Sequence, residues 1–207
     1  MAIPLTCPCP AGCEMLTLLQ AEGVLLRQEH VEPGGVVTIP GPAVLCRGAL
    51  VERCEETGQA VDLHVRGAVL LPQESPPVTL HALTRTAVGH VERSDRRPVS
   101  AEAQAAFVRA HARALRRRLQ VAQQSVLEDS VSRFFSSKAA EAGVRDAAGV
   151  LLPLPLTRRL VAEIVGCREE SLARLSARWT EEGRIEWSRN GVRLVQPEHF
   201  GLPARRV

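Results

Sequence analysis

Arginine and hydroxyl side chains, which can bind an anion, recur between residues 157 and 191 of the sequence. Apolar residues at 172, 175 and 179 follow helical spacing, which predicts a helix from about Arg168 to Glu182 with residues 168–171 and 174 on its outer side. On that side, the guanidinium of Arg174 can donate two hydrogen bonds to a guanine, and the carboxylate of Glu170 can accept one from cytosine N4. The segment therefore has the residue types needed to bind base edges.

The residues around this helix predict the elements that would position it. Thr157 can cap a preceding amphipathic helix, and Gly166 suits a tight turn between the two helices. Asn190-Gly191, between two short strands, is the strongest short signal for a β-hairpin. Together these elements predict a winged helix-turn-helix, whose second helix enters the DNA major groove. The candidate DNA-binding residues are Thr157, Arg158, Arg168, Glu169, Glu170, Ser171, Arg174 and Arg189, with Thr157, Arg158 and Arg189 placed for phosphate contacts.

A second amphipathic pattern lies between Ala101 and about Gln124, where the sequence has neither Gly nor Pro. Apolar residues at positions 105, 108, 112, 115, 119, 122 and 126 alternate by three and four, as in a heptad seam. The alternative is that the same stripe packs on the helix's own domain. The helix would be about 35 Å long, and small side chains along the seam allow close approach, which favours a dimerisation helix. Its seam residues are Val108, Ala112, Leu115, Leu119 and Ala122.

The remaining segments predict a sheet domain and one further helix. From Val24 to about Val91, short β-branched runs alternate with Gly- and Pro-containing turns, which predicts an antiparallel sandwich or small barrel. A helix is expected from Ser125 to Ala142, with residues 126, 127, 131, 134 and 135 on its buried side. After Gly143 we expect a connector or a short strand.

The segment LTRRLVAEIVGCREESLARLSARWTEEGRIEW resembles the C-terminal region of the Crp/Fnr (cyclic-AMP receptor and fumarate-nitrate regulator) family of bacterial transcription factors. The family pattern T-R-x-x-(V/I)-x-x-(I/V)-V-G-C-x-x-E-(S/T)-(V/L)-x-R is matched from Thr157 to Arg174. VLCRGALVERCEETGQAVDLHVRGAVLL resembles the family's β-roll, and the whole resemblance covers about residues 15–200.

This resemblance implies an α+β chain in three parts. These are an N-terminal antiparallel, jelly-roll-like β-roll (1–98), a dimerisation helix with the following helix (99–142), and a C-terminal winged helix-turn-helix (143–207). It also implies a homodimer that binds a two-fold symmetric site on double-stranded DNA, with RNA polymerase as a further candidate partner.

The sequence departs from the family patterns at two places. The cyclic-AMP-binding branch has an Arg before the recognition Glu, where this sequence has Glu169, and the oxygen-sensing branch has a Ser at the position of Ala173. In the nucleotide-binding cassette, Val78 and Thr79 stand where an Arg-Ala pair is expected. Without that Arg the charge-assisted contact to a cyclic phosphate is lost, so we expect no response to cyclic AMP.

The cysteines offer an alternative function. Cys7, Cys9 and Cys13, with Cys46 or Cys54, could supply four thiolates to an iron-sulfur cluster or zinc, as in a metal or redox sensor acting through protein contacts. C-x-C-x3-C is not a standard cluster signature, however, and unligated thiols or a redox-sensitive pair are the alternative. We therefore expect no cofactor. The six histidines show no ligand spacing either.

The composition excludes several classes of protein. With 207 residues, 45% of them hydrophobic and 24% charged, the chain is not collagen-like, wholly disordered or a simple coiled coil. It contains no apolar run long enough for a membrane span and begins with no signal-peptide pattern, so we expect a cytoplasmic protein without a membrane partner. No nucleophile–base pair, paired carboxylates or phosphate-binding loop supports an enzyme.

Overall fold

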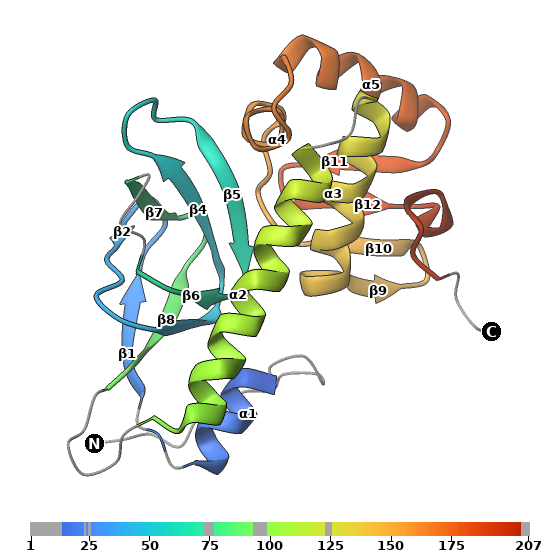
Figure 1. The fold of residues 1–207 in the computed structure, drawn as a ribbon. Coiled ribbons are helices and arrows are strands. Elements are labelled where there is room, and N and C mark those ends of the chain that lie inside the picture. Colours follow the sequence, from blue (N-terminus) through green and yellow to red (C-terminus); the bar gives the residue numbers. More distant parts are fainter. Residues whose placement is uncertain are drawn as a thin grey trace.

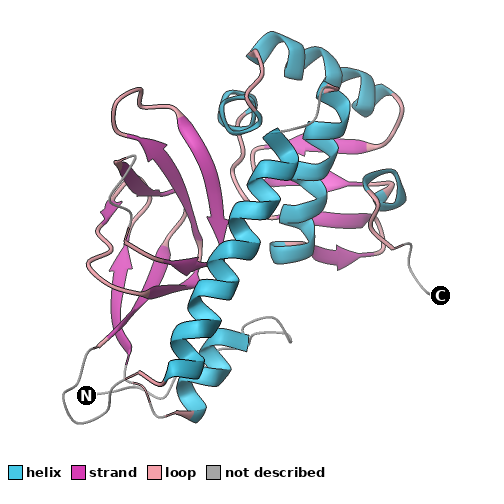
Figure 2. Ribbon diagram, viewed as in Figure 1, coloured by secondary structure: helices cyan, strands magenta, loops and turns pink. Residues whose placement is uncertain are grey.

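The computed structural model describes residues 14–22, 24, 26–72, 77–92, 99–122 and 126–203. An N-terminal β-roll and a C-terminal helical domain lie on either side of a long helix, α2 (Ala101–Ala122), as Figure 1 shows. Strands dominate the first domain and helices flank a small sheet in the second (Figure 2), which confirms the predicted α+β class. Within the described ranges, no helix is long and apolar enough to cross a membrane.

The β-roll consists of short strands arranged in two antiparallel sheets. These are β1 (Leu26–Val31), β2 (Val36–Val37), β3 (Ala43–Arg47), β4 (Ala49–Cys54), β5 (Ala60–Val65), β6 (Val69–Leu70), β7 (Val78–Ala82) and β8 (Thr86–Val91). One sheet has the order β1-β8-β3-β6 and the other β2-β7-β4-β5. Leu45, Leu50 and Val88 are fully buried in the cluster between them. The predicted antiparallel sandwich is therefore confirmed, and β5 is an edge strand.

Helix α2 begins at Ala101, where the sequence pattern predicts its start. The Ser100 hydroxyl caps the helix by accepting a hydrogen bond from the Ala103 backbone N–H at 3.0 Å. A short helix that the sequence did not predict, α1 (Glu14–Ala21), packs against it (Figure 1). The buried stripe of α2 contains Ala103 and Phe107, which share a cluster with Leu19 of α1 and Val44 of β3.

The predicted seam of α2 is a different stripe from the one that packs on its own domain. Val108 is 62% exposed and Leu119 57%, while Leu115 is also exposed and Ala112 is half-buried. The side chain of Ala122 lies outside those that the structure describes. Helix α2 therefore carries two apolar stripes, one buried in its own domain and one uncovered in the single chain.

The C-terminal domain forms one core from helices and two hairpins. Its elements are α3 (Leu127–Ala142), β9 (Val144–Asp146), β10 (Gly149–Leu152), α4 (Arg158–Val165), α5 (Glu169–Glu181), β11 (Ile185–Ser188), β12 (Gly191–Leu194) and the 3-10 helix η1 (Pro197–Phe200). The four strands have the order β11-β12-β10-β9. Phe135, Trp179 and Phe200 form the aromatic centre of the core, with Trp179 and Phe200 edge to face at 5.3 Å between ring centroids.

Two details differ from the sequence-based expectation for this domain. The segment after Gly143 is a complete hairpin that extends the C-terminal sheet, because β10 pairs with β12. Val126, expected on the buried side of the third helix, is exposed because α3 begins after it, at Leu127. Val131, Phe134 and Phe135 are buried as expected.

The two domains contact each other through strand β5 and, at Arg53, through the neighbouring strand β4. Leu63 of β5 and Leu160 of α4 belong to one buried cluster. The Glu163 carboxylate on α4 accepts hydrogen bonds from the backbone N–H of Ala60 at 3.0 Å and from the Arg53 guanidinium at 3.1 Å. The β-roll is thus joined to the first helix of the helix-turn-helix by apolar and polar contacts together.

Candidate nucleic-acid interface

The helix-turn-helix has residues that suit the start of its first helix and the turn between its two helices. Thr157 caps α4, with its hydroxyl accepting a hydrogen bond from the Leu160 N–H at 3.1 Å. Gly166 adopts a left-handed conformation with φ of 77°, which glycine reaches at little cost. Its N–H and that of Cys167 bond to the Ala162 carbonyl at 2.9 and 3.0 Å and end the helix. Both the predicted cap and the predicted turn are confirmed.

Helix α5 has the predicted phase. Leu172, Leu175 and Trp179 are buried, which leaves Glu169, Glu170 and Arg174 exposed on the opposite side. Arg174 forms no ion pair or hydrogen bond with any described residue, so its guanidinium is available for a ligand. The N-terminal half of α5 therefore presents donors and acceptors to the outside. Arg168 is exposed at the N-cap and Ser171 is half-buried.

Arg158 is held in place more firmly than the sequence indicated. Its Nε donates to the Ser176 hydroxyl of α5 at 3.0 Å, and its guanidinium carbon lies 5.1 Å from the centroid of the Trp187 ring. The Trp187 indole in turn donates to the Leu156 carbonyl at 2.8 Å. Arg158 thus connects α4, α5 and β11 while its side chain stays exposed. Ser176 was not predicted, because a buried serine within a helix gives no distinctive signal in the sequence.

The wing is the β11–β12 hairpin. Ser188 pairs with Gly191 across its turn, which confirms the hairpin predicted from Asn190-Gly191. Gly191 packs so tightly that an added Cβ would lie 2.0 Å from the Leu152 carbonyl oxygen. Arg189 is exposed at the tip, where no described residue pairs with its guanidinium.

A polar cluster that the sequence did not reveal holds α5 against α3. The Glu128 carboxylate accepts hydrogen bonds from the Trp179 indole and from Arg184, both at 3.1 Å, and it pairs with Arg178. The Trp179 hydrogen bond, followed by the Arg178 and Arg184 charges, holds the pKa of Glu128 below its ordinary value. The recognition helix is therefore tied to the first turn of α3 as well as to the core.

The structure places only part of the cysteine cluster. Cys7, Cys9 and Cys13 lie outside the described residues, so their role as metal ligands stays a prediction. Cys46 is buried in β3, whereas Cys54 is partly exposed at the end of β4. Hydrogen bonds from Thr57, first from its backbone and then from its hydroxyl, lower the pKa of the Cys54 thiol.

Cys167, in the turn between α4 and α5, is half-buried at the edge of the core. Burial raises the pKa of its thiol.

Comparison with known proteins identifies the C-terminal domain. Residues 131–200 match the model of the Crp-like helix-turn-helix domain, a range that contains every candidate DNA-binding residue. The full fold is similar to that of solved regulators whose sequences are too distant to show more than the fold. The chain therefore carries a Crp-like helix-turn-helix domain and has the overall fold of solved CRP/FNR-family regulators.

Three solved structures illustrate this likeness of fold. A CRP-family transcriptional regulator of Thermus thermophilus is 19% identical with a TM-score of 0.64, over 83% of this chain and 94% of that one. FixK2 of Bradyrhizobium japonicum is 15% identical with a TM-score of 0.69, over 89% and 100%. A cyclic nucleotide-binding domain containing protein of Listeria monocytogenes is 12% identical with a TM-score of 0.70, over 89% and 99%. No curated protein matches the sequence.

Proposed function

We propose that the protein is a homodimeric transcription regulator that binds specific DNA sequences. The observation that carries this proposal is the outer side of α5, where Glu170 and Arg174 stand exposed within a Crp-like helix-turn-helix domain. They lie four residues apart and therefore on one side of the helix. An Arg at such a position can bind guanine O6 and N7 together, a pattern no other base offers in the major groove.

The uncovered stripe of α2 supports the dimer. Val108, Leu115 and Leu119 form an apolar row on a helix whose other stripe already serves the β-roll. Pairing of this row with the same row of a second chain would remove it from water. A two-fold axis along α2 would then place the two α5 helices of the dimer, as recognition helices, in successive major grooves. The expected half-sites are then about 34 Å, or one helical turn, apart.

The β-roll cavity supports the proposal that cyclic AMP is not the effector. Val78 and Thr79, at the position of the missing Arg-Ala pair, line a cavity of about 260 Å³ together with Glu52 and Glu55. Among the described residues lining it there is no Arg or Lys. A cyclic phosphate would therefore meet carboxylates rather than a guanidinium. Millimolar cyclic AMP should raise neither the melting temperature nor the DNA affinity, and a clear melting shift would contradict this part of the proposal.

The decisive experiment selects a preferred site from random duplexes and compares two arginine variants on it. Arg174→Ala should cost about 1–3 kcal/mol of binding at the selected site and relax the preference at one base pair per half-site. Arg189→Ala, at the exposed wing, should weaken selected and random DNA nearly equally and make binding less dependent on salt. Both side chains lack described partners, so neither substitution should disturb the fold.

The different effects expected of Arg174→Ala and Arg189→Ala distinguish base recognition from phosphate binding. If Arg174→Ala weakened selected and random duplexes by the same factor, Arg174 would not be reading a base. If the selection recovered no preferred sequence at all, the proposed function itself would be wrong. Arg158→Ala is less informative because Arg158 also contacts Ser176 and Trp187.

A further inference from the structure

Three side chains that commonly bind metal ions meet on β4 and β5, away from the DNA-binding side of α5. Glu52 and Asp62 are direct partners across the strand pair, and His64, two residues beyond Asp62, pairs with Leu50. One carboxylate oxygen each from Glu52 and Asp62 and a ring nitrogen of His64 lie within 4.8 Å of one another. No ligand spacing was expected among the histidines. The Asp-x-His pattern in a strand was the missed signal, because alternate residues of a strand share a side.

The burial of these carboxylates distinguishes them from a solvated acidic patch. Glu52 is 1% exposed and Asp62 7%. Two carboxylates so close together and so far from water need nearby positive charge. Their contacts include His64 Nε2 at 2.7 Å from Glu52, the Leu63 N–H at 2.7 Å from Asp62, and Lys138 Nζ at 3.8 Å from Asp62. A single divalent cation among the three ligand atoms would supply two positive charges at once.

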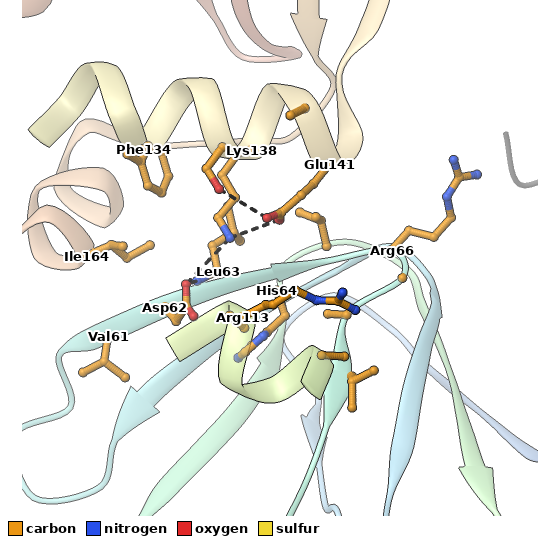
Figure 3. A pocket seen from close by; sticks show the side chains of 18 of the residues that line it. Val61, Asp62, Leu63, His64, Arg66, Arg113, Phe134, Lys138, Glu141 and Ile164 are labelled. Atoms are coloured by element: carbon orange, nitrogen blue, oxygen red, sulfur yellow. Dashed lines mark hydrogen bonds and ion pairs between the residues drawn. The ribbon is translucent and has the colours of Figure 1, made fainter. Parts of the chain in front are cut away.

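The three residues also lie between two cavities. Glu52 and His64 line the cavity of about 260 Å³ inside the β-roll, to which α2 contributes His111. Asp62 and His64 line a second cavity, of about 550 Å³, between β5, α2 and α3. Figure 3 shows Asp62 extending from β5 toward Lys138 of α3 at the wall of this second cavity. The cavities give an ion a route to the site and leave room for water to complete its coordination.

We propose that Glu52, Asp62 and His64 bind a divalent first-row transition metal ion such as Mn²⁺ or Zn²⁺, and that this ion is an effector of the regulator proposed above. Two carboxylates and one imidazole suit these ions better than Mg²⁺ or Ca²⁺, which prefer all-oxygen sites. Three protein ligands leave at least one coordination position for water. The proposed ligand set contains no thiolate.

Binding of the ion would alter the contact between the two domains. Lys138 on α3 contacts both Asp62 of β5 and Glu141 of its own helix, at 3.8 and 3.4 Å. An ion at Asp62 competes with the Lys138 ammonium for the same carboxylate. Occupancy of the site therefore changes the link between β5 and α3. The role as an effector rests on the proposed DNA-binding function, whereas the binding of the ion does not.

The test is a titration of the full-length chain, stripped with a chelator, with Mn²⁺ followed by electron paramagnetic resonance. We expect one tightly bound ion per chain and a melting temperature that rises with Mn²⁺ concentration. Asp62→Asn and His64→Gln should each weaken binding on the order of 100-fold, because loss of a ligand exceeds the 10- to 100-fold effect of losing its supporting residues. Lys138→Gln removes the competing ammonium and should strengthen binding. His81→Gln, on neighbouring β7 and outside the triad, is the matched control and should bind like wild type.

Two further measurements distinguish binding at the triad from binding at the cysteines and from loss of the fold. The combined variant Cys7→Ser, Cys9→Ser, Cys13→Ser should keep the Mn²⁺ affinity of wild type, and the metal-free melting temperatures of the triad variants show whether they fold. If one triad variant does not fold, the Mn²⁺ affinities of the other variant and of wild type still test the site. Absence of saturable Mn²⁺ binding to wild type, or unchanged binding in a folded triad variant, would overturn the site. Mn²⁺ binding that leaves DNA affinity unchanged, in a chain that binds DNA, would overturn only the effector role.

Discussion

The Glu163 carboxylate should contribute more to stability than any exposed ion pair of the molecule, because it joins the two domains from a buried position. Its side chain is only 17% exposed. It accepts hydrogen bonds from the Ala60 N–H at 3.0 Å, from Arg53 at 3.1 Å and from Arg159 at 2.9 Å. The first two donors belong to the β-roll, whereas Arg159 lies on α4 itself. Substitution of Glu163 therefore tests the domain contact directly.

The expected loss of stability follows from the burial of each hydrogen-bond partner of Glu163. A hydrogen bond to a charged group contributes about 1.5–3 kcal/mol, and a buried N–H left without an acceptor costs about 1–3 kcal/mol. Arg159 is 78% exposed, so its ion pair adds at most about 0.5 kcal/mol. We therefore expect Glu163→Ala to lower the free energy of unfolding by about 2–4 kcal/mol. Glu163→Gln should lower it by about 1–2 kcal/mol, since the amide oxygen can still accept from Ala60.

Urea unfolding of both variants measures these differences, with Arg159→Ala as the matched control. Hydrogen exchange of the Ala60 amide gives the local measurement, because loss of its acceptor should speed exchange at that residue more than at other amides of the sheet. Glu163 does not join the domains if Glu163→Ala lowers the free energy of unfolding no more than Arg159→Ala does and leaves hydrogen exchange at Ala60 unchanged. That result would mean that the domains are held together by their apolar contacts alone.

The Glu163 contact predicts that the stability of the protein depends on pH. Burial alone would raise the pKa of Glu163, but the Ala60 N–H and the guanidinium groups of Arg159 and Arg53 outweigh it and hold the pKa below its ordinary value of 4.5. A carboxylate with a lowered pKa stabilises the fold above its unfolded-state pKa and loses that contribution as pH falls through its folded-state pKa. The stability gap between wild type and Glu163→Gln should therefore narrow below about pH 4.5, and a gap that widened there would contradict the assignment.

Three other substitutions test separate parts of the structure. Leu115→Asp combined with Leu119→Asp should convert the proposed dimer to a folded monomer with weakened DNA binding, as measured by sedimentation and gel shift. Arg109→Asp, off the predicted seam, should leave the proposed dimer intact. Phe107→Ala should lower the free energy of unfolding by about 3–5 kcal/mol, because Phe107 is buried against the β-roll, while Arg109→Ala should change it by less than about 0.5 kcal/mol. Glu128→Gln should cost about 1 kcal/mol at pH 7, discounted because Glu128 is 38% exposed, and this difference should shrink as pH falls below the ordinary glutamate value of 4.5.

Local signals made the helix-turn-helix predictable from the sequence. A cap at Thr157, a left-handed glycine at Gly166 and a hairpin turn before Gly191 each act within a few residues, so short-range chemistry determines them. The β9–β10 hairpin was not predicted, because β9 is exposed along its whole length and has no alternation of polar and apolar residues. Its position depends on the pairing of β10 with β12, which is distant in the sequence.

The side-chain clusters were harder to predict than the elements, because they depend on register. Glu52 meets Asp62 because β4 and β5 pair in the register that sets Ala49 opposite Val65, and neither strand alone shows that register. Periodicity identified the apolar positions of α2, but it could not tell which of two stripes the β-roll would bury. Phe107, between the seam positions 105 and 108, belongs to the other stripe.

Strand β5 is where the β-roll can influence the DNA-binding domain. It is an edge strand of its sheet, and both α3 and α4 of the second domain contact it. Asp62 contacts Lys138 of α3, and the Ala60 N–H bonds to Glu163 of α4. A shift of β5 must therefore move or break contacts with both helices. Since Arg158 of α4 also bonds to Ser176 of α5, such a shift reaches the recognition helix through a continuous series of hydrogen bonds and packed side chains.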